Sequence, residues 1–575
     1  AVELAEYTIN NQKDYILEEL YKRKPDVLCF SCYIWNIDYV TDIAREYKKL
    51  CPSVPIWVGG PEVSYEVEAF LRENPYIDGV MIGEGEDTFR ELCGYYAHKR
   101  KLSDIAGIAF RKNSTGNSTS VNNIGGNKAG EIVFTSPRPI KNMSEIPFCY
   151  DTLDDFSNRI IYYESSRGCP FSCSYCLSSV DKTLRFRDTR IVKKELKFFI
   201  DQKVPQIKFV DRTFNCNHAH AMELWRFIKA NDNGVTNFHF EISADLLNQE
   251  ELELISDMRP GLIQLEIGVQ STNEVTIKEI HRTMKLERLK EVVRLIQSGN
   301  NIHEHLDLIA GLPYEDYDSF GRSFDEIYEL KPNQLQLGFL KVLKGSYMFE
   351  HAAEYGIVYH DKPPYEVMST KWLSFDDVIK IKRVEEMLEV YYNSGQFEIT
   401  MKLMECIFDS AFEFFQELGD FYEANGYFGM SHSRIRRCEI LLEFLALYLH
   451  GCDSDDMASV GLSGNAGDRD NTDFDENAQI YKMIQESLIF DLYYRENCKS
   501  RPVWATDIGS FKHMTHAYCK NGKLSHVEPF HYIFPDKHTR KLDELPKYHK
   551  EPVWALFHYD MRDPLDHQAL VEYVE

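Results

Sequence analysis

Three cysteines stand within eight residues of one another, in the stretch SSRGCPFSCSYC at 165–176. Cys169, Cys173 and Cys176 have the spacing CxxxCxxC, and thiolates are ligands of soft and borderline metals. The chain has 14 cysteines, but another close pair, Cys29 with Cys32, has no further partners that would complete a ligand set. The three clustered thiols are therefore the first candidate for chemistry.

Zinc, an iron–sulfur cluster and an ordinary core are the alternatives for these thiols. Structural zinc takes four protein ligands, and no histidine stands closer in sequence than His98 and His218. A four-iron cluster normally has one thiolate per iron, so three cysteines would leave one iron open to another ligand. The turn residues Gly168 and Pro170 disfavour three ordinary core cysteines. The spacing favours an iron–sulfur cluster.

The first 110 residues alternate strand-like apolar runs with stretches of helical periodicity. Buried parallel strands form continuous apolar runs, and their alternation with helices predicts a doubly wound, Rossmann-like sheet. The stretch VELAEYTI near the start is predicted to be a further strand. Ligands of such sheets bind at the carboxyl ends of the strands, where glycines fall. The strands are expected in 26–35, 54–60 and 77–86, and the helices in 37–50, 62–74 and 87–100.

A longer set of six strand and helix units follows a linker. Residues 113–130 are rich in Asn, Ser, Thr and Gly and are predicted to form a mobile loop. The repeated strand–helix order after it predicts a partial (β/α)6 TIM-type barrel, which carries its chemistry at the strand ends. The strands are expected at 160–165, 206–211, 237–242, 262–269, 303–309 and 334–340, and the helices at 190–202, 216–230, 248–257, 285–298 and 318–329.

The last third of the chain reads as mainly helical. Helices are predicted in 366–450 and 476–495, an acidic loop in 452–475, and strands around an Asn521-Gly522 turn in the tail from 503 to 534. Four histidines lie close in sequence there, but their spacings match no metal site: His513, His516, His526 and His531. We expect four parts: 1–110 (Rossmann-like domain), 111–158 (loop and linker), 159–345 (barrel) and 346–575 (helical, substrate-specifying domain).

Charge and hydropathy narrow the class of partner. The formal net charge is −26, which repels nucleic-acid backbones. No apolar run approaches the roughly 20 residues of a membrane helix, and the start lacks a basic-then-apolar signal pattern. The sequence therefore predicts a cytoplasmic protein with a small-molecule substrate, no membrane partner and no nucleic acid.

The cysteine stretch resembles the signature of the radical S-adenosylmethionine (SAM) enzymes, CxxxCx(aromatic)C. The match is made by Cys169, Cys173, Tyr175 and Cys176. The resemblance implies a 4Fe–4S cluster whose open iron binds the amino and carboxylate groups of SAM, and whose reduction yields a 5′-deoxyadenosyl radical. It further implies that the enzyme is sensitive to oxygen and acts under anaerobic conditions. It also implies an electron donor such as flavodoxin or ferredoxin.

Four other expected strand ends look like those of the same family: FVDRTFN (209–215), EISADLL (241–247), LEIGVQS (265–271) and DLIAGLPYE (307–315). By this resemblance Tyr175 and residues 309–313 contact the adenine, while Glu266 and Gln270 lie near the ribose or methionine. Three carboxylates have an alternative role, in which they pair with arginine and lysine inside the barrel: Asp211, Glu241 and Glu266. The residues implied in SAM binding are Tyr175, Asp211, Glu241, Glu266, Gln270, Ile309, Gly311 and Pro313.

The glycine-marked sheet ahead of the barrel looks like the cobalamin-binding domain of one large subgroup of the family. The stretches that carry this resemblance are WVGGPEVSY (57–65) and VMIGEGEDTFREL (80–92). Residues 1–97 contain no histidine, so this domain supplies no imidazole to cobalt and a base-off cofactor is expected. Trp35 is expected to cover the corrin, with an ordinary core position as its alternative. The residues implied in cobalamin binding are Ser31, Trp35, Gly59, Gly60, Pro61, Glu62, Gly83, Glu84, Gly85 and Glu86.

The predicted function is a cobalamin-dependent radical SAM methyltransferase that acts on an unactivated carbon or phosphorus of a small molecule. The first alternative is a radical rearrangement, cyclisation or reduction in which cobalamin assists without donating a methyl group. A non-enzymatic cobalamin sensor or carrier is the second alternative, and it leaves the cysteines and barrel motifs without a purpose. The sequence does not identify the substrate.

Overall fold

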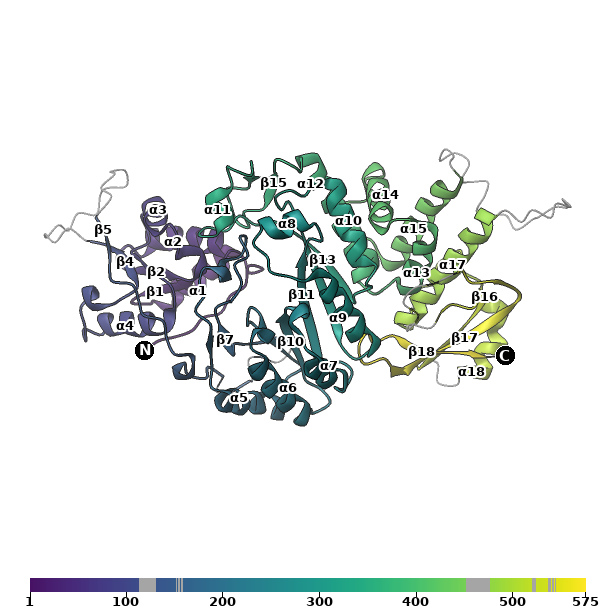
Figure 1. The fold of residues 1–575 in the computed structure, drawn as a ribbon, viewed down its shortest axis with the longest axis horizontal. Coiled ribbons are helices and arrows are strands. Elements are labelled where there is room, and N and C mark those ends of the chain that lie inside the picture. The colour runs from purple at the N-terminus through teal and green to yellow at the C-terminus, as the bar shows by residue number, and fades with distance from the viewer. Residues whose placement is uncertain are drawn as a thin grey trace.

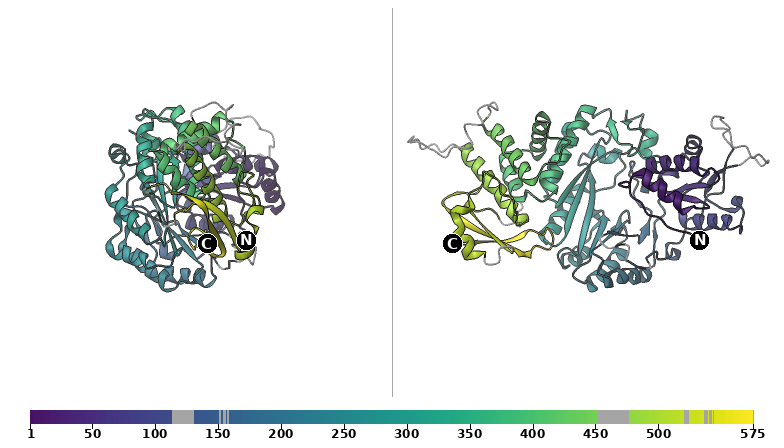
Figure 2. Two further views of the ribbon diagram at one scale, coloured as in Figure 1. Left: turned by 90° about the vertical axis from the view of Figure 1, so that its right-hand side faces the viewer. Right: turned by 180° about the vertical axis from the view of Figure 1, so that it is seen from behind.

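The computed structural model describes residues 1–112, 131–450 apart from 151, 154, 155, 157 and 158, 476–519, and 524–574 apart from 536–538, 540, 541 and 543. The molecule is elongated, with an open sheet at the N-terminal end, a larger parallel sheet in the middle, and helices with a small antiparallel sheet at the C-terminal end (Figure 1). The view from behind shows the same order, with the central strands between the two outer parts (Figure 2).

The N-terminal sheet has the order β1-β2-β3-β4-β5. Strands β1 (Leu28–Ser31), β2 (Ile56–Gly59) and β3 (Gly79–Met81) are parallel, and β4 (Ile108–Arg111) and β5 (Ile132–Phe134) add in antiparallel fashion. Helices α1 (Lys13–Arg23), α2 (Ile37–Leu50) and α3 (Val67–Glu73) share one apolar cluster with the sheet, and α4 (Gly85–Tyr96) belongs to another. The expected Rossmann-like architecture is confirmed.

One expected element of this domain is wrong. The stretch VELAEYTI was predicted as a strand, but residues 1–8 form neither strand nor helix. Val2 and Leu4 are 68% and 85% exposed, so these apolar side chains have no sheet face to cover. Alternation of apolar and polar residues favours a strand only where a neighbouring strand pairs with it.

The central sheet is all-parallel, with the order β13-β12-β11-β10-β9-β6. Its end strands do not pair with each other, so the sheet is an open, partial barrel, as expected. The strands are β6 (Ile161–Tyr163), β9 (Gln206–Phe209), β10 (Asn237–Ile242), β11 (Ile263–Gln270), β12 (His303–Ala310) and β13 (Gln334–Phe339). The helices between them are α5 (Thr189–Asp201), α6 (His218–Ala230), α7 (Gln249–Ser256), α8 (Glu274–Glu279), α9 (Leu286–Ser298) and α10 (Tyr317–Tyr328).

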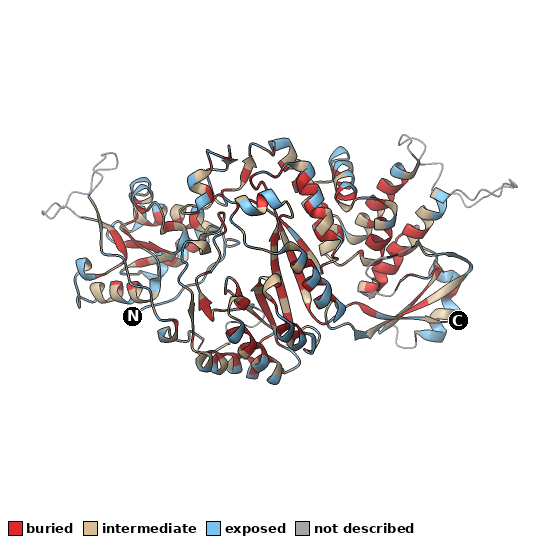
Figure 3. Cartoon of the chain, in the orientation of Figure 1, coloured by how far each residue is buried: buried red, intermediate tan, exposed pale blue. Residues whose placement is uncertain are grey.

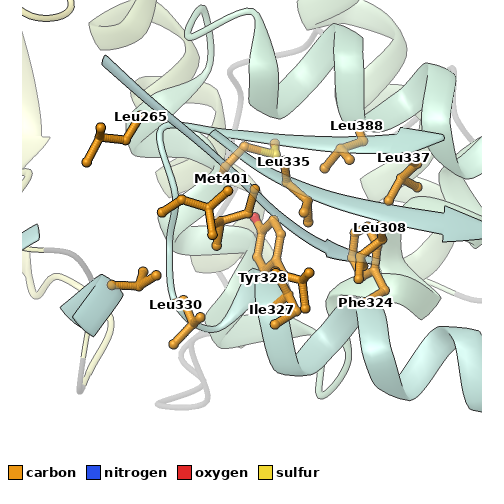
Figure 4. Packing of buried hydrophobic residues seen from close by; sticks show 14 of the residues in the cluster. Leu265, Leu308, Phe324, Ile327, Tyr328, Leu330, Leu335, Leu337, Leu388 and Met401 are labelled. Carbon is orange, nitrogen blue, oxygen red and sulfur yellow. The ribbon is translucent and has the colours of Figure 1, made fainter. Parts of the chain in front are cut away.

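The two faces of this sheet differ in polarity. Along β11 the residues alternate strictly between buried and partly exposed, and the buried ones are all aliphatic. Figure 3 shows buried stretches in these strands, and also in the N-terminal sheet and in the C-terminal helices. In Figure 4 the strand leucines Leu265, Leu308 and Leu335 point into a core that includes Phe324 of α10 and Met401 of a C-terminal helix. The other face is left to polar residues, which is where chemistry can take place.

The C-terminal part packs its helices against α10 and ends in an antiparallel sheet. Its helices are α11 (Tyr347–His351), α12 (Phe375–Leu388), α13 (Glu398–Ile407), α14 (Ala411–Ala424), α15 (Arg434–His450), α17 (Glu476–Arg495) and α18 (Lys512–Tyr518). Its strands are β14 (Val358–Tyr359), β15 (Val367–Ser369), β16 (Ser525–Tyr532), β17 (Tyr548–Arg562) and β18 (Ala569–Val574). Among the described residues no helix combines the length and the apolar character needed to span a membrane.

The expected strands of the tail are only partly correct. Residues 525–532 form β16, but the stretch before them contains α18 instead of a strand, and β16 pairs with β17. Pairing between distant segments decided this, and local sequence does not encode it. The Asn521-Gly522 turn and the loops expected at 113–130 and 452–475 lie outside the described residues.

Candidate functional site

The three cysteines lie in the loop of a two-stranded hairpin formed by β7 (Ser166–Arg167) and β8 (Arg185–Phe186). Cys169 and Cys173 are buried and Cys176 is half-buried. Gly168 has a φ of 86°, and a Cβ there would lie 2.5 Å from the carbonyl oxygen of Thr183. Only glycine fits this neck of the hairpin.

The thiols sit close enough to influence one another's charge. Burial raises the pKa of Cys169, and the neighbouring thiols Cys173 and Cys176 raise it further. No three His, Cys, Asp or Glu side chains in the described part of the chain are grouped as a single metal ion would require. Ligands of a four-iron cluster each bind a different iron, so they need not crowd around one point. The hairpin loop thus suits a cluster better than one ion.

Asp211 holds the start of the hairpin in place through hydrogen bonds. Its carboxylate is fully buried and accepts hydrogen bonds from the Ser165 backbone N–H (2.9 Å), the Ser165 hydroxyl (2.7 Å) and the Ser166 hydroxyl (2.5 Å). These three donors fix the chain immediately before the cysteines. All of these hydrogen-bond donors to Asp211 belong to the protein itself. That Asp211 contacts SAM therefore stays a prediction.

We expect Asp211 to give the protein a pH-dependent stability. Burial raises the pKa of Asp211 to about 6, whereas an aspartate in an unfolded chain titrates near 4. The native form is therefore favoured while Asp211 is protonated, and this stability is lost as the pH rises from about 4 to about 6. Relative to Asp211→Asn, the wild type should lose up to about 3 kcal/mol of its free energy of unfolding over that interval. Thermal unfolding of both proteins at each pH would measure this loss.

Asp188→Asn is the matched control. Hydrogen bonds from Arg190 lower the pKa of Asp188 to about 2, so this group is ionised throughout the same interval. Its substitution should give an offset that does not change between pH 4 and 6. An equal trend in both variants would contradict the assignment to Asp211.

Arg282 is a site residue that no sequence motif indicated. Its guanidinium Nη1 lies 3.1 Å from the Tyr175 hydroxyl and 3.8 Å from the Cys173 sulfur, and Nη2 donates to the carbonyl of Gly268. The Nε atom is buried and finds no hydrogen-bond partner among the described residues. The expected position of Tyr175 next to the cluster ligands is consistent with this arrangement, and Arg282 adds a positive charge there.

The end of β11 is shaped by a bulge. Its register with β12 shifts between Gly268 and Gln270, and Gln270 adopts a φ of 76°, which is strained for a residue with a side chain. A Cβ on Gly268 would lie 2.3 Å from the side-chain Nε2 of Gln270 and 3.4 Å from Arg282 Nη2. The Gln270 Oε1 is buried and has no hydrogen-bond partner in the described part of the chain. The Gln270 side chain and the Arg282 guanidinium both approach Gly268, and their unpaired atoms fit a polar ligand such as SAM.

Glu241 and Glu266 stand opposite each other on β10 and β11, and their environments differ. Although burial opposes it, hydrogen bonds from His239 and Lys208 lower the pKa of Glu266 to about 2. Burial and the neighbouring Glu266 raise the pKa of Glu241 to about 7. Glu266 is therefore an ion-paired carboxylate: Lys208 Nζ and His239 Nε2 each lie 2.9 Å from its Oε2. Glu266 thus pairs with cations inside the barrel, which was the alternative expected from the sequence. Glu241 has no ion-pair partner among the described residues.

The remaining residues expected to bind SAM lie at the end of β12. Ile309 lies on β12, two residues after Asp307. The Asp307 Oδ1 is 3.1 Å from His305 Nε2, and burial raises the pKa of Asp307. Gly311 has a φ of 88°, and a Cβ there would lie 2.7 Å from a Val367 methyl group. The Pro313 carbonyl accepts from Thr276 Oγ1 at 2.9 Å. These contacts fix the shape of the segment, and its contact with adenine stays a prediction.

The residues expected to bind cobalamin cluster at the carboxyl ends of β1, β2 and β3. Gly60 follows Gly59 with a φ of 114°, and a Cβ on it would lie 2.4 Å from the Cys32 carbonyl oxygen, one residue after Ser31. By contrast, apart from the neighbouring residues in the chain, no described atom lies within 4 Å of where a Cβ would stand on Gly83 or Gly85. This open backbone suits a bulky ligand that approaches closely, as a corrin would.

Trp35 belongs to the surface of this region. It is 62% exposed and stacks on Tyr33 with ring centroids 4.5 Å apart, so the alternative of an ordinary core position is wrong. Glu62 follows Pro61 in a short turn and accepts a hydrogen bond from the Tyr365 hydroxyl. Glu62 thereby links this domain to the segment after β13.

Glu84 and Glu86 are engaged by the cysteine hairpin. Glu84 lies 2.5 Å from Arg185 and Glu86 lies 2.6 Å from Arg167, oxygen to nitrogen. The resemblance gave both residues to cobalamin, which no contact in the chain tests. The four histidines of the tail form no metal site in the described residues; His526, for example, pairs with Glu528 at 2.6 Å.

Comparison with known proteins identifies the class that these features define. The B12 binding domain family matches residues 1–93 and the radical SAM superfamily matches residues 163–327. The chain therefore carries an N-terminal B12-binding domain followed by a radical SAM domain. A third family, described as a protein of unknown function (DUF4080), matches residues 353–568, so the chain also carries a DUF4080 C-terminal domain.

Two curated relatives each match about half of the chain. The chain is 28% identical over 330 residues to the cobalamin-dependent radical SAM methyltransferase TokK of Streptomyces tokunonensis, a match that covers 53% of this chain and 45% of that protein. It is 22% identical over 337 residues to the anaerobic magnesium-protoporphyrin IX monomethyl ester cyclase of Rubrivivax gelatinosus, covering 56% of this chain and 57% of that protein. The chain thus spans about half the length of these two relatives.

A solved structure shares the fold. The structure of the cobalamin-dependent SAM radical enzyme OxsB with aqua-cobalamin and SAM bound superposes with a TM-score of 0.51 at 16% identity. The superposition covers 84% of this chain and 74% of that one. At this identity the likeness establishes the architecture, including the order of an open sheet, a partial barrel and a further C-terminal part.

Proposed function

We propose that this protein is a cobalamin-dependent radical SAM methyltransferase that acts on an unactivated carbon or phosphorus of a small molecule. The observation that carries the proposal is the meeting of the cysteine hairpin with the strand ends of both sheets. Tyr175 and Arg282 contact one another beside Cys173 on one side, and Glu84 reaches Arg185 from the other. The match to TokK supports methyl transfer as the reaction.

The residues present fit three bound groups. Cys169, Cys173 and Cys176 would hold a 4Fe–4S cluster, the segment around Gln270 and Arg282 would hold SAM, and the open strand ends at Gly83 and Gly85 would face cobalamin. When bound, the cluster and SAM supply a 5′-deoxyadenosyl radical, and cobalamin supplies the methyl group. An electron donor such as flavodoxin or ferredoxin and a cytoplasmic location belong to the same proposal.

The side chains around the expected SAM site have distinct roles in the proposed reaction. The Arg282 guanidinium is a fixed cation that orients a carboxylate, and the Gln270 amide offers an unused acceptor next to it. Glu266 stays ionised because Lys208 and His239 hold it. Glu241 faces it with a pKa near 7, so it can hold or release a proton at neutral pH and accept hydrogen bonds from an amino or hydroxyl group.

Anaerobic reconstitution with iron, sulfide, cobalamin, SAM and a reductant tests the proposal. Formation of both 5′-deoxyadenosine and S-adenosylhomocysteine, with candidate small molecules present, supports methyl transfer. Formation of S-adenosylhomocysteine is the decisive readout, because it reports the used methyl donor. Absence of both products with an intact cluster would rule out the proposed function.

A second candidate is a radical cyclisation in which cobalamin assists without giving up a methyl group. The match to the anaerobic magnesium-protoporphyrin IX monomethyl ester cyclase favours it. In the same assay this reaction would yield 5′-deoxyadenosine without S-adenosylhomocysteine. The two candidates therefore differ in one measured product.

Trp35 provides a test of cobalamin binding that does not need a substrate. An exposed, stacked indole in the loop after β1 can cover a flat ring system with little loss of side-chain entropy. We expect Trp35→Ala to weaken cobalamin binding about tenfold, measured by equilibrium dialysis or by quenching of tryptophan fluorescence. Trp57, which is buried in the sheet, gives the control variant Trp57→Phe, with unchanged affinity expected. Equal affinity of Trp35→Ala and wild type would remove Trp35 from the site.

A further inference from the structure

The base of the cysteine hairpin carries two like charges that face each other. Arg167 of β7 and Arg185 of β8 are direct cross-strand partners in an antiparallel pair. Like charges at such positions destabilise a hairpin, and this one has only two residues in each strand. A carboxylate group that both arginines share would offset this repulsion.

That group comes from the N-terminal sheet. Glu84 Oε1 lies 2.5 Å from Arg185 Nη1 and 3.4 Å from Arg167 Nη1. Glu86 Oε1 lies 2.6 Å from Arg167 Nη2. Both glutamates follow β3 and open helix α4, at the strand ends where the sheet has its glycines. Two carboxylates of one domain thus neutralise the two cations at the neck of the cysteine loop.

The contact is well placed to be strong. The four side chains are only 14–28% exposed, so water and salt screen them less than surface pairs. The second oxygen of Glu84 accepts the Lys141 backbone N–H at 3.1 Å, which fixes the carboxylate from behind. Each arginine also binds an acid of its own segment: Glu164 for Arg167 and Asp181 for Arg185. The arginines are therefore preorganised toward the glutamates.

We propose that Glu84 and Glu86 are positioning residues, which clamp the carboxyl end of β3 to the hairpin that holds Cys169, Cys173 and Cys176. The clamp sets one fixed spacing between the ligand sites of the two sheets. Its consequence for product formation rests on the proposed function, whereas the clamp itself does not. The resemblance assigned both glutamates to cobalamin, and the clamp gives them a different task.

Hydrogen exchange of the full chain tests the clamp without any substrate. In Glu84→Gln, which keeps the size of the side chain, the amides of residues 168–184 should exchange about fivefold faster than in the wild type. Glu91→Gln is the matched control, because Glu91 lies on the same helix α4, is 17% exposed, and pairs with Arg100 and Arg138 instead of the hairpin. Equal exchange in Glu84→Gln and Glu91→Gln would overturn the clamp.

A double-mutant cycle separates the contact from a general loss of stability. Once Arg185→Gln has removed one partner, adding Glu84→Gln should have little further effect on the exchange of residues 168–184. Additive effects of the two substitutions would overturn the pairing of these side chains. Cobalamin affinity measured on the same variants should stay within about twofold of the wild type. A large loss of affinity with unchanged exchange would make Glu84 a cofactor ligand instead.

Product ratios then report what the clamp does in turnover. If the two ligand sites lose their spacing, the radical forms but the methyl transfer that follows is missed. Glu84→Gln should therefore raise the ratio of 5′-deoxyadenosine to methylated product about tenfold, with cluster content unchanged. An unchanged ratio alongside faster exchange would overturn the fixed spacing as a functional device. A wild type that forms no methylated product would contradict the proposed function and leave the exchange result standing.

Discussion

Replacing Cys173 by alanine is expected to remove the visible absorbance of the four-iron cluster and to lower 5′-deoxyadenosine formation more than about 100-fold. Cys173 is buried in the hairpin loop, and its sulfur lies 3.8 Å from Arg282 Nη1. The sequence offers only three thiols with this spacing, so losing one leaves two irons without a cysteine. The checks are the iron content after anaerobic reconstitution, the absorbance spectrum and the product assay.

Cys216→Ala is the matched control for this substitution. Cys216 is half-buried near Cys169, and burial raises its pKa to about 11, so it is a poor source of thiolate. The variant should keep its cluster and most of its activity. A full cluster spectrum and normal turnover in Cys173→Ala, or loss of the cluster in Cys216→Ala, would contradict the assignment of the three ligands.

The sequence predicted the barrel well because its elements are locally encoded. All six expected barrel strands appear, since each is a short run bounded by turn residues that pairs in parallel with the next strand of the sheet. Helix α17 also has the predicted bounds, although its apolar residues do not gather on one face and residues 487–494 are all buried. The cysteine loop was predicted from residue types alone.

What the sequence did not reveal depends on long-range contacts. Arg282 lies in an ordinary loop after α8, and only folding brings its guanidinium 3.1 Å from Tyr175. The difference between Glu241 and Glu266 arises from Lys208 and His239 on neighbouring strands, which no spacing along the chain indicates. Glu84 was read as a ligand residue because it ends a glycine-rich strand, and its arginine partner lies 101 residues away.

Replacing Arg282 by methionine is expected to have the second-largest effect, a rise in the KM for SAM of about 100-fold. Methionine keeps most of the volume but removes every donor and the positive charge beside Cys173. Although burial opposes it, the neighbouring Tyr175 and Cys173 raise the pKa of Arg282, so the guanidinium is charged throughout the accessible range. Losing a cation next to a ligand sulfur should also make the cluster harder to reduce, measured as a lower midpoint potential.

Two further variants show which property of Arg282 matters. Arg282→Lys keeps the charge but cannot serve Tyr175, Cys173 and Gly268 at once, so its KM should fall between those of the wild type and Arg282→Met. Arg288→Met is the matched control on α9, where Arg288 donates to the Leu247 carbonyl, and it should leave KM and potential unchanged. If Arg282→Met retained a normal KM and potential, Arg282 would merely fill space behind the cysteine loop. A changed potential with a normal KM would place its charge at the cluster but outside the SAM site.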